Sequence, residues 1–185
     1  MRINQATVDL IKRWEGFRPD AYVCPAGKWT IGYGITSGAG IGVNPTAGMR
    51  VTQEEAERHL KMALERFATQ IEPAIMAPIN ENEFGAFLSL AYNIGPSAFR
   101  KSSALRHFNE GNKNKAAESI ALWNKATVNG KRKVLQGLVN RRADEIALFN
   151  TPVASTPAAP APTAKQTGLA ALIAQILRAI FGGTK

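Results

Sequence analysis

The sequence predicts a mostly helical α+β domain, followed by a linker and a separate amphipathic segment. Three observations favour this fold class. Apolar residues recur at helical spacing in several segments, one short region alternates polar and apolar residues between glycines, and the composition changes abruptly after Asn150. We therefore expect a domain at residues 1–150, a Pro/Ala/Thr-rich linker at 151–167 and an amphipathic C-terminal helix at 168–185.

The chain begins with a predicted helix and a small β region. Residues 4–14 place Val8, Ile11 and Trp14 on one helical face. Residues 22–35 alternate polar and apolar side chains between glycine turns, which is typical of short strands. We expect this β region to form the smaller of two lobes.

A long helix should link the small lobe to the rest of the domain. Thr52 and Glu55 have the spacing of a capping box, which marks a helix start. The helix should stop at Pro73, which cannot continue it. Its predicted apolar face consists of Ala56, Leu60, Leu64, Phe67, Ala68 and Ile71.

Further helices should complete a helical body, with a cleft between the two lobes. Residues 81–93 are rich in apolar and aromatic side chains and predict a buried helix that ends at Gly95 and Pro96. Shorter helices are predicted at residues 102–110, 115–125 and 135–149.

The composition excludes several classes of protein. A single cysteine rules out an intrachain disulfide, and no run of about 18 apolar residues predicts a transmembrane helix. The N-terminus lacks the apolar core of a signal peptide, so we expect synthesis in the cytoplasm. The phosphate-binding, zinc-protease, serine-hydrolase and dinucleotide motifs are missing, and His59 and His107 do not have metal-ligand spacing. We expect neither a cofactor nor a metal.

The net charge of +9, from 23 basic and 14 acidic residues, favours a polyanionic partner. Candidates are nucleic acid, anionic lipid, lipopolysaccharide and an acidic cell wall. The chain has basic runs such as Lys131, Arg132 and Lys133, but no recognised nucleic-acid-binding motif, so we expect no specific nucleic acid. The alternative for such a run is a solvated basic face.

The stretch WEGFRPDAYVCPAGKWTIGYG contains the candidate catalytic residues. Glu15 ends an apolar helical face and should be partly buried; burial disfavours the charged carboxylate, which suits a general acid in glycosidic bond cleavage. Cys24 follows nine residues later and Thr30 fifteen residues later. Asp20 is the competing carboxylate, but it follows Pro19 and is expected to make a local turn hydrogen bond.

The spacing of Glu15, Cys24 and Thr30 resembles the signature of the phage lysozymes of glycoside hydrolase family 24. Three further blocks resemble, in order, the start of this family's long linking helix, its central helix and its closing helix: GMRVTQEEAERHL, LSLAYNIGPSAFRKSSAL and GLVNRRADEIALF. The resemblance implies a lysozyme-like, two-lobed fold. It also implies an endolysin that hydrolyses the β-1,4 bond between N-acetylmuramic acid and N-acetylglucosamine in peptidoglycan.

The resemblance implies a role for each residue of the signature. Glu15 would be the general acid, while Cys24 and Thr30 would position or activate the attacking water. Cys24 stands where many relatives have Asp, which leaves open whether it acts as a base or only holds the water. The stereochemical course stays open as well.

Four other residues are candidates for binding substrate or supporting the site: Tyr33, Asn93, Arg141 and Arg142. The resemblance implies that one of the two arginines approaches Glu15. The alternative function is a non-catalytic protein that binds cell wall or another polyanion on the same fold. An intact Glu15 argues against that alternative.

The resemblance also implies a substrate and a way for the protein to leave the host cytoplasm. The substrate would be peptidoglycan glycan strands, and the protein would stay in the host cytoplasm until a pore-forming partner such as a holin releases it to the periplasm or cell wall.

The C-terminal tail has a different chemistry from the domain. Between Leu169 and Phe181, apolar residues recur at intervals of three and four, while residues 151–185 contain three basic residues and no acidic residue. Such a helix would lie in a membrane interface, against outer-membrane lipid or lipopolysaccharide, or assemble with copies of itself, or fold back onto the domain.

Overall fold

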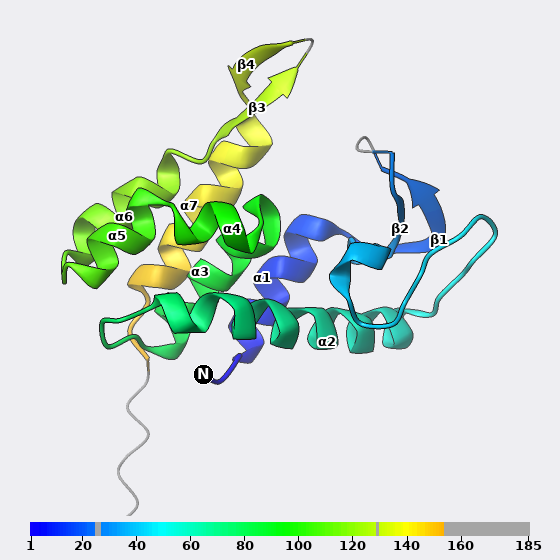
Figure 1. Ribbon diagram of the computed structural model, residues 1–185, viewed down its shortest axis with the longest axis horizontal. Helices are drawn as coiled ribbons and strands as arrows, with labels where there is room; N and C mark the ends of the chain where they lie inside the picture. Colours follow the sequence, from blue (N-terminus) through cyan, green and yellow to red (C-terminus); the bar gives the residue numbers. More distant parts are fainter. Residues whose placement is uncertain (25–26, 129, 154–185) are drawn as a thin grey trace, which may run out of the picture. The chain divides into compact units, whose positions relative to one another are not determined.

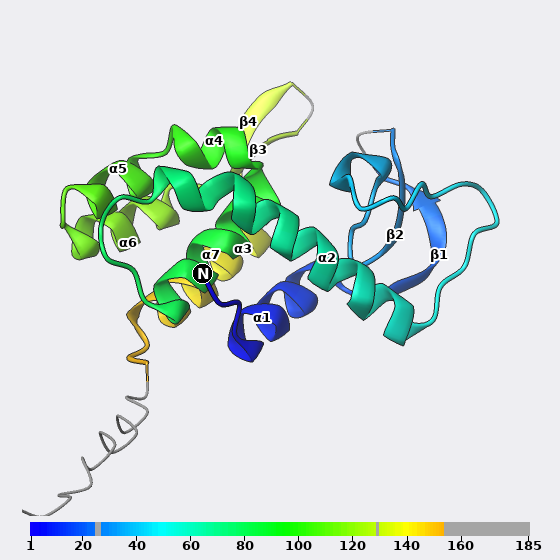
Figure 2. The same cartoon turned by 60° about the horizontal axis from the view of Figure 1, so that its bottom comes forward.

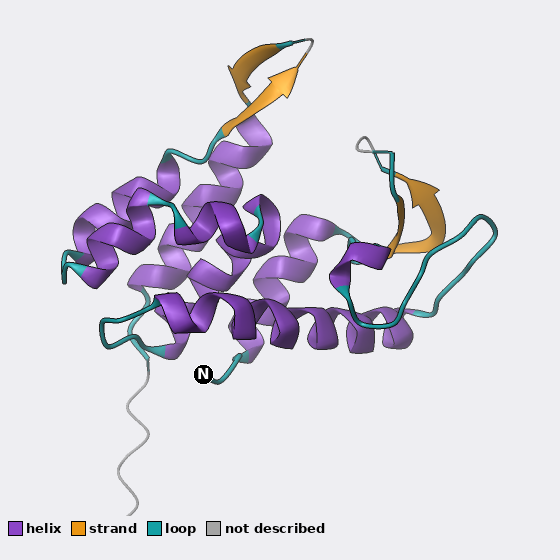
Figure 3. Ribbon diagram, in the orientation of Figure 1, coloured by secondary structure: helices purple, strands orange, loops and turns teal. Residues whose placement is uncertain are grey.

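The computed structural model describes residues 1–24, 27–128 and 130–153, where helices predominate and strands occur in two separate pairs (Figures 1 and 3). Residues 1–153 form one compact unit. The predicted amphipathic helix and all but the start of the predicted linker lie outside the described residues. No helix in the described ranges is long and apolar enough to cross a membrane.

Helix α1 (Gln5–Glu15) leads into the small β lobe. Asn4 caps the helix by accepting a hydrogen bond from the Thr7 backbone N–H, and Gly16 ends it with φ of 66°. Strand β1 (Arg18–Val23) then pairs antiparallel with β2 (Trp29–Gly32). The helix is confirmed, whereas the β region begins at Arg18 and not at residue 22. A short 3₁₀ turn, η1 (Ser37–Ala39), follows.

Helix α2 (Gln53–Ile71) extends from the small lobe to the other helices (Figure 2). The predicted capping box is confirmed, because Thr52 and Glu55 exchange both hydrogen bonds. A Cβ on Gly32 would come 2.9 Å from Ala56 Cβ, so β2 lies directly on the start of α2. A 3₁₀ turn, η2 (Glu72–Ala74), ends this segment.

The helical body is built around α3 (Glu81–Ile94), whose residues 82–91 are all buried. The Phe87 ring lies 5.1 Å from those of Phe99 and Phe108 and 5.4 Å from that of Phe149, measured between centroids. These rings join α3 to three of its neighbours and form the centre of the core. The surrounding helices are α4 (Pro96–Arg100), α5 (Ser103–Asn109), α6 (Lys113–Ala121) and α7 (Gln136–Asn150).

Helix α1 approaches α3 closely at Gly85. A Cβ there would lie 1.9 Å from Thr7 Oγ1, so only glycine allows this contact. The Thr7 side chain is fully buried and its hydroxyl donates to Asn4 Oδ1 at 2.7 Å. This contact sets where α1 runs and therefore where Glu15, its last residue, is held.

A hairpin between α6 and α7 was not predicted, and neither was the short helix α4. The helix expected at residues 115–125 ends at Ala121, and strands β3 (Lys125–Val128) and β4 (Lys131–Val134) form an antiparallel hairpin before α7. Asn129-Gly130 stands between the paired residues Val128 and Lys131, which is a strong two-residue hairpin signal. The basic residues on either side lack the apolar alternation that usually reveals strands.

Candidate active site

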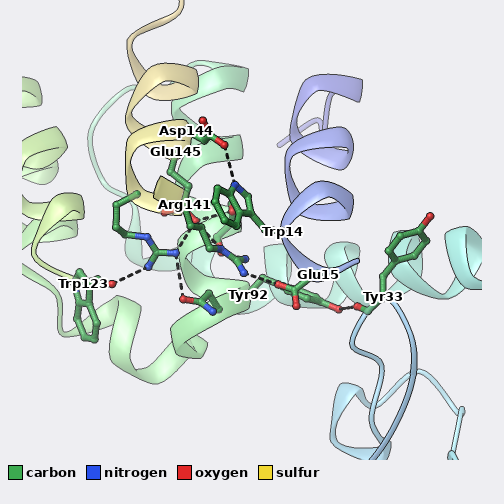
Figure 4. A network of polar contacts seen from close by, with 11 residues as sticks. Trp14, Glu15, Tyr33, Tyr92, Trp123, Arg141, Asp144 and Glu145 are labelled. Carbon is green, nitrogen blue, oxygen red and sulfur yellow. Dashed lines mark hydrogen bonds and ion pairs between the residues drawn. The ribbon is translucent and has the colours of Figure 1, made fainter. Parts of the chain in front are cut away.

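Glu15 lies at the C-terminal end of α1 and is paired with an arginine from α7 (Figure 4). Arg141 Nη1 donates to Glu15 Oε1 at 2.8 Å, and the exposed fractions of the two side chains are 5% and 20% respectively. The other carboxylate oxygen, Oε2, lies beside Gly34, where a Cβ would come within 3.3 Å. Arg141 therefore holds one oxygen of the Glu15 carboxylate, and the residue beside the other oxygen, Gly34, has no side chain.

A second contact fastens the same turn of α1 to α7. Trp14 Nε1 donates to Asp144 Oδ2 at 3.1 Å, and the Arg13 guanidinium lies 3.4 Å from the same oxygen. Because the contacts from Trp14 and Glu15 reach residues one helical turn apart on α7, they fix the direction of the Glu15 side chain.

Behind Arg141 lies a buried network centred on Glu145. Glu145 Oε1 accepts hydrogen bonds from Ser89 Oγ at 2.7 Å, from Arg142 Nη2 at 2.9 Å and from Arg141 Nε at 3.3 Å. Burial raises the pKa of Glu145, while the two guanidiniums and the Ser89 hydroxyl act in the opposite direction. Its carboxylate balances the buried charge of Arg142 and shares that of Arg141 with Glu15.

Arg142 connects this network to two other parts of the body. It donates through Nη2 to Asn93 Oδ1 at 3.2 Å and through Nη1 to the Trp123 carbonyl at 3.4 Å. Burial lowers the pKa of Arg142, and Glu145 opposes that effect. Of the two arginines, Arg141 is the one that contacts Glu15.

Tyr92 and Tyr33 join the small lobe to α3. Tyr92 Oη donates to the Tyr33 carbonyl at 3.0 Å. Burial raises the pKa of Tyr92, and the negative charge of Glu15 raises it further, so this hydroxyl stays a neutral donor. The Tyr33 ring is buried in the core and lies 5.6 Å from the Phe17 ring. Tyr33 therefore supports the site through its backbone.

Cys24 and Thr30 meet at the turn between β1 and β2. The Lys28 carbonyl accepts from the Cys24 backbone N–H at 2.9 Å and from Thr30 Oγ1 at 3.1 Å. Thr30 is buried, and Cys24 is partly exposed. Because the Thr30 hydroxyl donates its hydrogen bond to the Lys28 carbonyl, its lone pairs can accept a further hydrogen bond.

A cavity of about 310 Å³ opens beside Glu15 and combines residues of the small lobe, α2 and α3. Its lining is formed by Glu15, Lys28, Gly34, Thr36, Gly38, Ala39, Phe67, Tyr92 and Asn93. Cys24 and Thr30 are not among the lining residues, although both are hydrogen-bonded to the carbonyl of Lys28, which is. A larger groove of about 760 Å³ lies between α1 and α2 and contains none of the candidate catalytic residues.

Asp20 does not line the Glu15 cavity. It lies within β1, its side chain is 66% exposed, and its Oδ1 atom is 3.4 Å from Arg50 Nη1. The expected local turn hydrogen bond was wrong, because residues 18–23 are extended and Asp20 forms a bridge with Arg50. Glu15 is thus the one carboxylate among the residues that line the cavity. Within the described parts of the chain, no cluster of three His, Cys, Asp or Glu side chains could hold a metal ion.

Comparison with known proteins agrees with this geometry. The family model for phage lysozyme matches residues 12–145. The chain belongs to the phage lysozyme family. The endolysin of Acyrthosiphon pisum secondary endosymbiont phage 1 is 40% identical over 151 residues, which cover 82% of this chain and 99% of that protein. As a member of this family, the protein is a glycoside hydrolase and a peptidoglycan-hydrolysing endolysin.

Solved structures show the same fold. The endolysin from Escherichia coli O157:H7 phage FAHEc1 superposes with a TM-score of 0.75 at 38% identity, covering 83% of this phage lysozyme and 96% of that chain. The muramidase domain of SpmX from Asticaccaulis excentricus gives a TM-score of 0.75 at 39% identity, covering 82% and 99%. The expected family and lysozyme-like fold are confirmed.

Several residues around Glu15 were not predicted from the sequence to belong to the site: Trp14, Lys28, Gly34, Ser89, Tyr92, Asp144 and Glu145. Glu145 had a local signal, since it follows Arg142 by three residues and Arg141 by four, which places the three side chains on one face of a helix. Tyr92 had none, because its partner Tyr33 is 59 residues away in the sequence.

Proposed function

We propose that this phage lysozyme cleaves the bond between N-acetylmuramic acid and N-acetylglucosamine with Glu15 as the general acid. The observation that carries this assignment is the pairing of Glu15 with Arg141 at the edge of a cavity in which it is the one carboxylate. A glycosidic oxygen needs a proton donor at a fixed position, and the ion pair holds the carboxyl group in one orientation.

The proton would leave from the Glu15 oxygen beside Gly34, since Arg141 occupies the other. It would move to the glycosidic oxygen as that oxygen takes the electron pair of the breaking bond. Gly34 supports this assignment because a larger residue would project toward that carboxylate oxygen, where the sugar must approach.

Cys24 and Thr30 would act on the water that replaces the leaving sugar. The Thr30 hydroxyl donates to the Lys28 carbonyl, so its lone pair would accept a hydrogen bond from the water and orient it. Cys24, on the same turn, would accept or hold the other proton through its sulfur. Both assignments rest on the shared Lys28 carbonyl and on the family signature.

Replacing Glu15 by glutamine tests the assignment. The Glu15→Gln variant should lose lysis of outer-membrane-stripped cells by at least about 100-fold, because an amide cannot donate the required proton. Its carbonyl oxygen can still accept from Arg141, so circular dichroism and the melting temperature should stay close to wild type. A folded variant with wild-type lysis would disprove the role of Glu15.

Two further proposals concern the cell. Release from the host cytoplasm would depend on a holin, because peptidoglycan, the substrate of this family, lies outside the inner membrane. The segment Leu169 to Phe181 would contact outer-membrane lipid or lipopolysaccharide, because an apolar stripe beside Arg178 suits an anionic interface.

A further inference from the structure

The β3–β4 hairpin is a ribbon of exposed cations. Lys125, Lys131, Arg132 and Lys133 are all solvent-exposed, and none forms an ion pair with another residue in the described ranges. No acidic residue occurs anywhere from residue 119 to residue 143. The positive charge of the hairpin is therefore not balanced locally.

The pairing of the strands puts cations on both faces of the ribbon. Lys133 lies opposite Ala126 and Lys131 opposite Val128, while Arg132 lies opposite Thr127. Because side chains alternate along a strand, Lys131 and Lys133 point to one face and Arg132 to the other. All four residues of β4 are exposed, so this strand contributes nothing to the core. A role in packing does not explain it.

The base of the hairpin is attached to the network behind the catalytic acid. Leu135 N donates to the Asn124 carbonyl at 3.0 Å, which closes the ribbon. The neighbouring Trp123 carbonyl accepts from Arg142, and Arg142 also holds Asn93, a lining residue of the Glu15 cavity. In Figures 1 and 2 strands β3 and β4 project from the helical body in the same direction as β1 and β2 extend from α2. A polymer that extends from the cavity past Asn93 would reach the hairpin.

We propose that the β3–β4 hairpin is an accessory subsite that binds the carboxylates of the peptides attached to the glycan strand. This inference rests on the proposed function of Glu15, and it names a part of the substrate that the cavity itself does not contact. Peptidoglycan peptides carry free carboxylates, and lysine and arginine side chains pair with them. The hairpin thereby attracts the charged part of the substrate while Glu15 acts on the sugar.

The ribbon fits acidic peptides better than nucleic acid. Residues 125–134 contain no aromatic side chain on which a base could stack, and stacking is a major contribution in the binding of single strands. The position beside the cavity also links the ribbon to the substrate that the enzyme must already hold.

The test compares two triple variants with the same loss of charge. One combines Lys131→Gln, Arg132→Gln and Lys133→Gln. The matched control combines Lys61→Gln, Lys101→Gln and Lys115→Gln, three exposed residues that form no ion pair with described residues and do not line the Glu15 cavity. Each protein is assayed on purified peptidoglycan and on the same material after its peptide carboxylates have been converted to amides.

On intact peptidoglycan at low ionic strength, the hairpin variant should be about tenfold slower than wild type, as expected for three partly screened charge pairs. On amidated peptidoglycan, and on intact peptidoglycan at high salt, the hairpin variant and the wild type should have equal rates. The control should lose much less on intact material. The inference is overturned if the hairpin variant is equally impaired on both substrates, or no more impaired than the control.

Co-sedimentation of the wild-type, hairpin and control proteins with both forms of peptidoglycan, measured on ice before hydrolysis proceeds, gives the same comparison for binding alone. Preferential loss of binding to the intact form supports the subsite even if the assignment of Glu15 fails, so the two failures are distinguishable. Wild-type rates and binding on peptidoglycan, combined with lost affinity for a DNA oligonucleotide, would identify a nucleic-acid surface instead and overturn the proposal.

Discussion

The Glu15 carboxylate and the Arg141 guanidinium form a largely buried ion pair that depends on a second acid. Arg141 is held from behind by Glu145, which also contacts Arg142 and Ser89. Removing one partner from a buried set of charges leaves the others uncompensated, which is costly. We therefore expect the position of Arg141, and with it the orientation of Glu15, to depend on Glu145, a residue that is fully buried.

Cys24 offers a prediction at the scale of one side chain. Cys24→Asp should keep substantial lytic activity because a carboxylate can take a proton from water, whereas Cys24→Ala should be at least about tenfold slower. The turn should survive both changes, since Cys24 is held there by backbone hydrogen bonds to Lys28 and Gly27. Turbidity assays with matched melting curves provide the measurement. An unchanged rate for Cys24→Ala would make the thiol structural.

At the scale of elements, the contact between α1 and α3 positions Glu15, the proposed catalytic acid. Gly85→Ala adds a methyl group that would overlap Thr7 Oγ1, so either the Thr7 side chain or α1 must move. Alanine favours a helix by up to about 1 kcal/mol over glycine, but overpacking typically costs 1 to 3 kcal/mol and should dominate. We expect a lower free energy of unfolding in urea together with reduced lysis.

Gly137→Ala on α7 is the matched control, because a Cβ there meets no atom within 4 Å. This variant should be as stable as wild type, or more stable, and fully active. Equal stability of the Gly85→Ala and Gly137→Ala variants would show that α1 adjusts freely and does not set the position of Glu15.

The capping box of α2 predicts a dependence on pH. The backbone hydrogen bond from Thr52 lowers the pKa of Glu55 below its ordinary value of 4.5. A lowered folded-state pKa stabilises the fold above the unfolded value, and this contribution is lost as the pH falls through the folded value. The melting temperature of wild type should therefore exceed that of Glu55→Gln at pH 7, and the difference should vanish under acidic conditions. A constant difference would contradict this.

At the scale of the whole molecule, the domain should function without the tail. We make the cut after Val153, which keeps Thr151, because the Thr151 carbonyl accepts from Asn82 Nδ2 and its hydroxyl donates to the Ala147 carbonyl. Hydrolysis of purified peptidoglycan should be nearly unchanged in the truncated protein, since few contacts cross a linker of this composition. Lysis of intact Gram-negative cells should fall.

Dye leakage from anionic vesicles, measured for the full-length and truncated proteins, separates the alternatives for the tail. Leakage caused by the full-length protein alone supports a membrane role. Equal lysis of intact cells with no leakage would exclude that role. A large loss on purified peptidoglycan would instead indicate that the tail docks on the domain.

The sequence by itself determined the features that depend on neighbouring residues. The capping box at Thr52 and Glu55, the helical stripes and the spacing of Glu15, Cys24 and Thr30 all lie within short stretches, and local hydrogen bonds and side-chain periodicity specify them. The family resemblance followed from the same local blocks. Even the missed β3–β4 hairpin had a local signal in Asn129-Gly130, obscured by the basic residues around it.

The tertiary structure alone decided which distant groups meet. Arg141 is 126 residues from Glu15, and nothing in either segment distinguishes it from Arg142 as the partner. The choice follows from how α1 packs on α3 at Gly85 and how α7 turns Arg141 toward α1 and Arg142 toward Asn93. Such pairs depend on the packing of whole helices, because rotating one helix by a single residue would exchange the side chains that face the cavity.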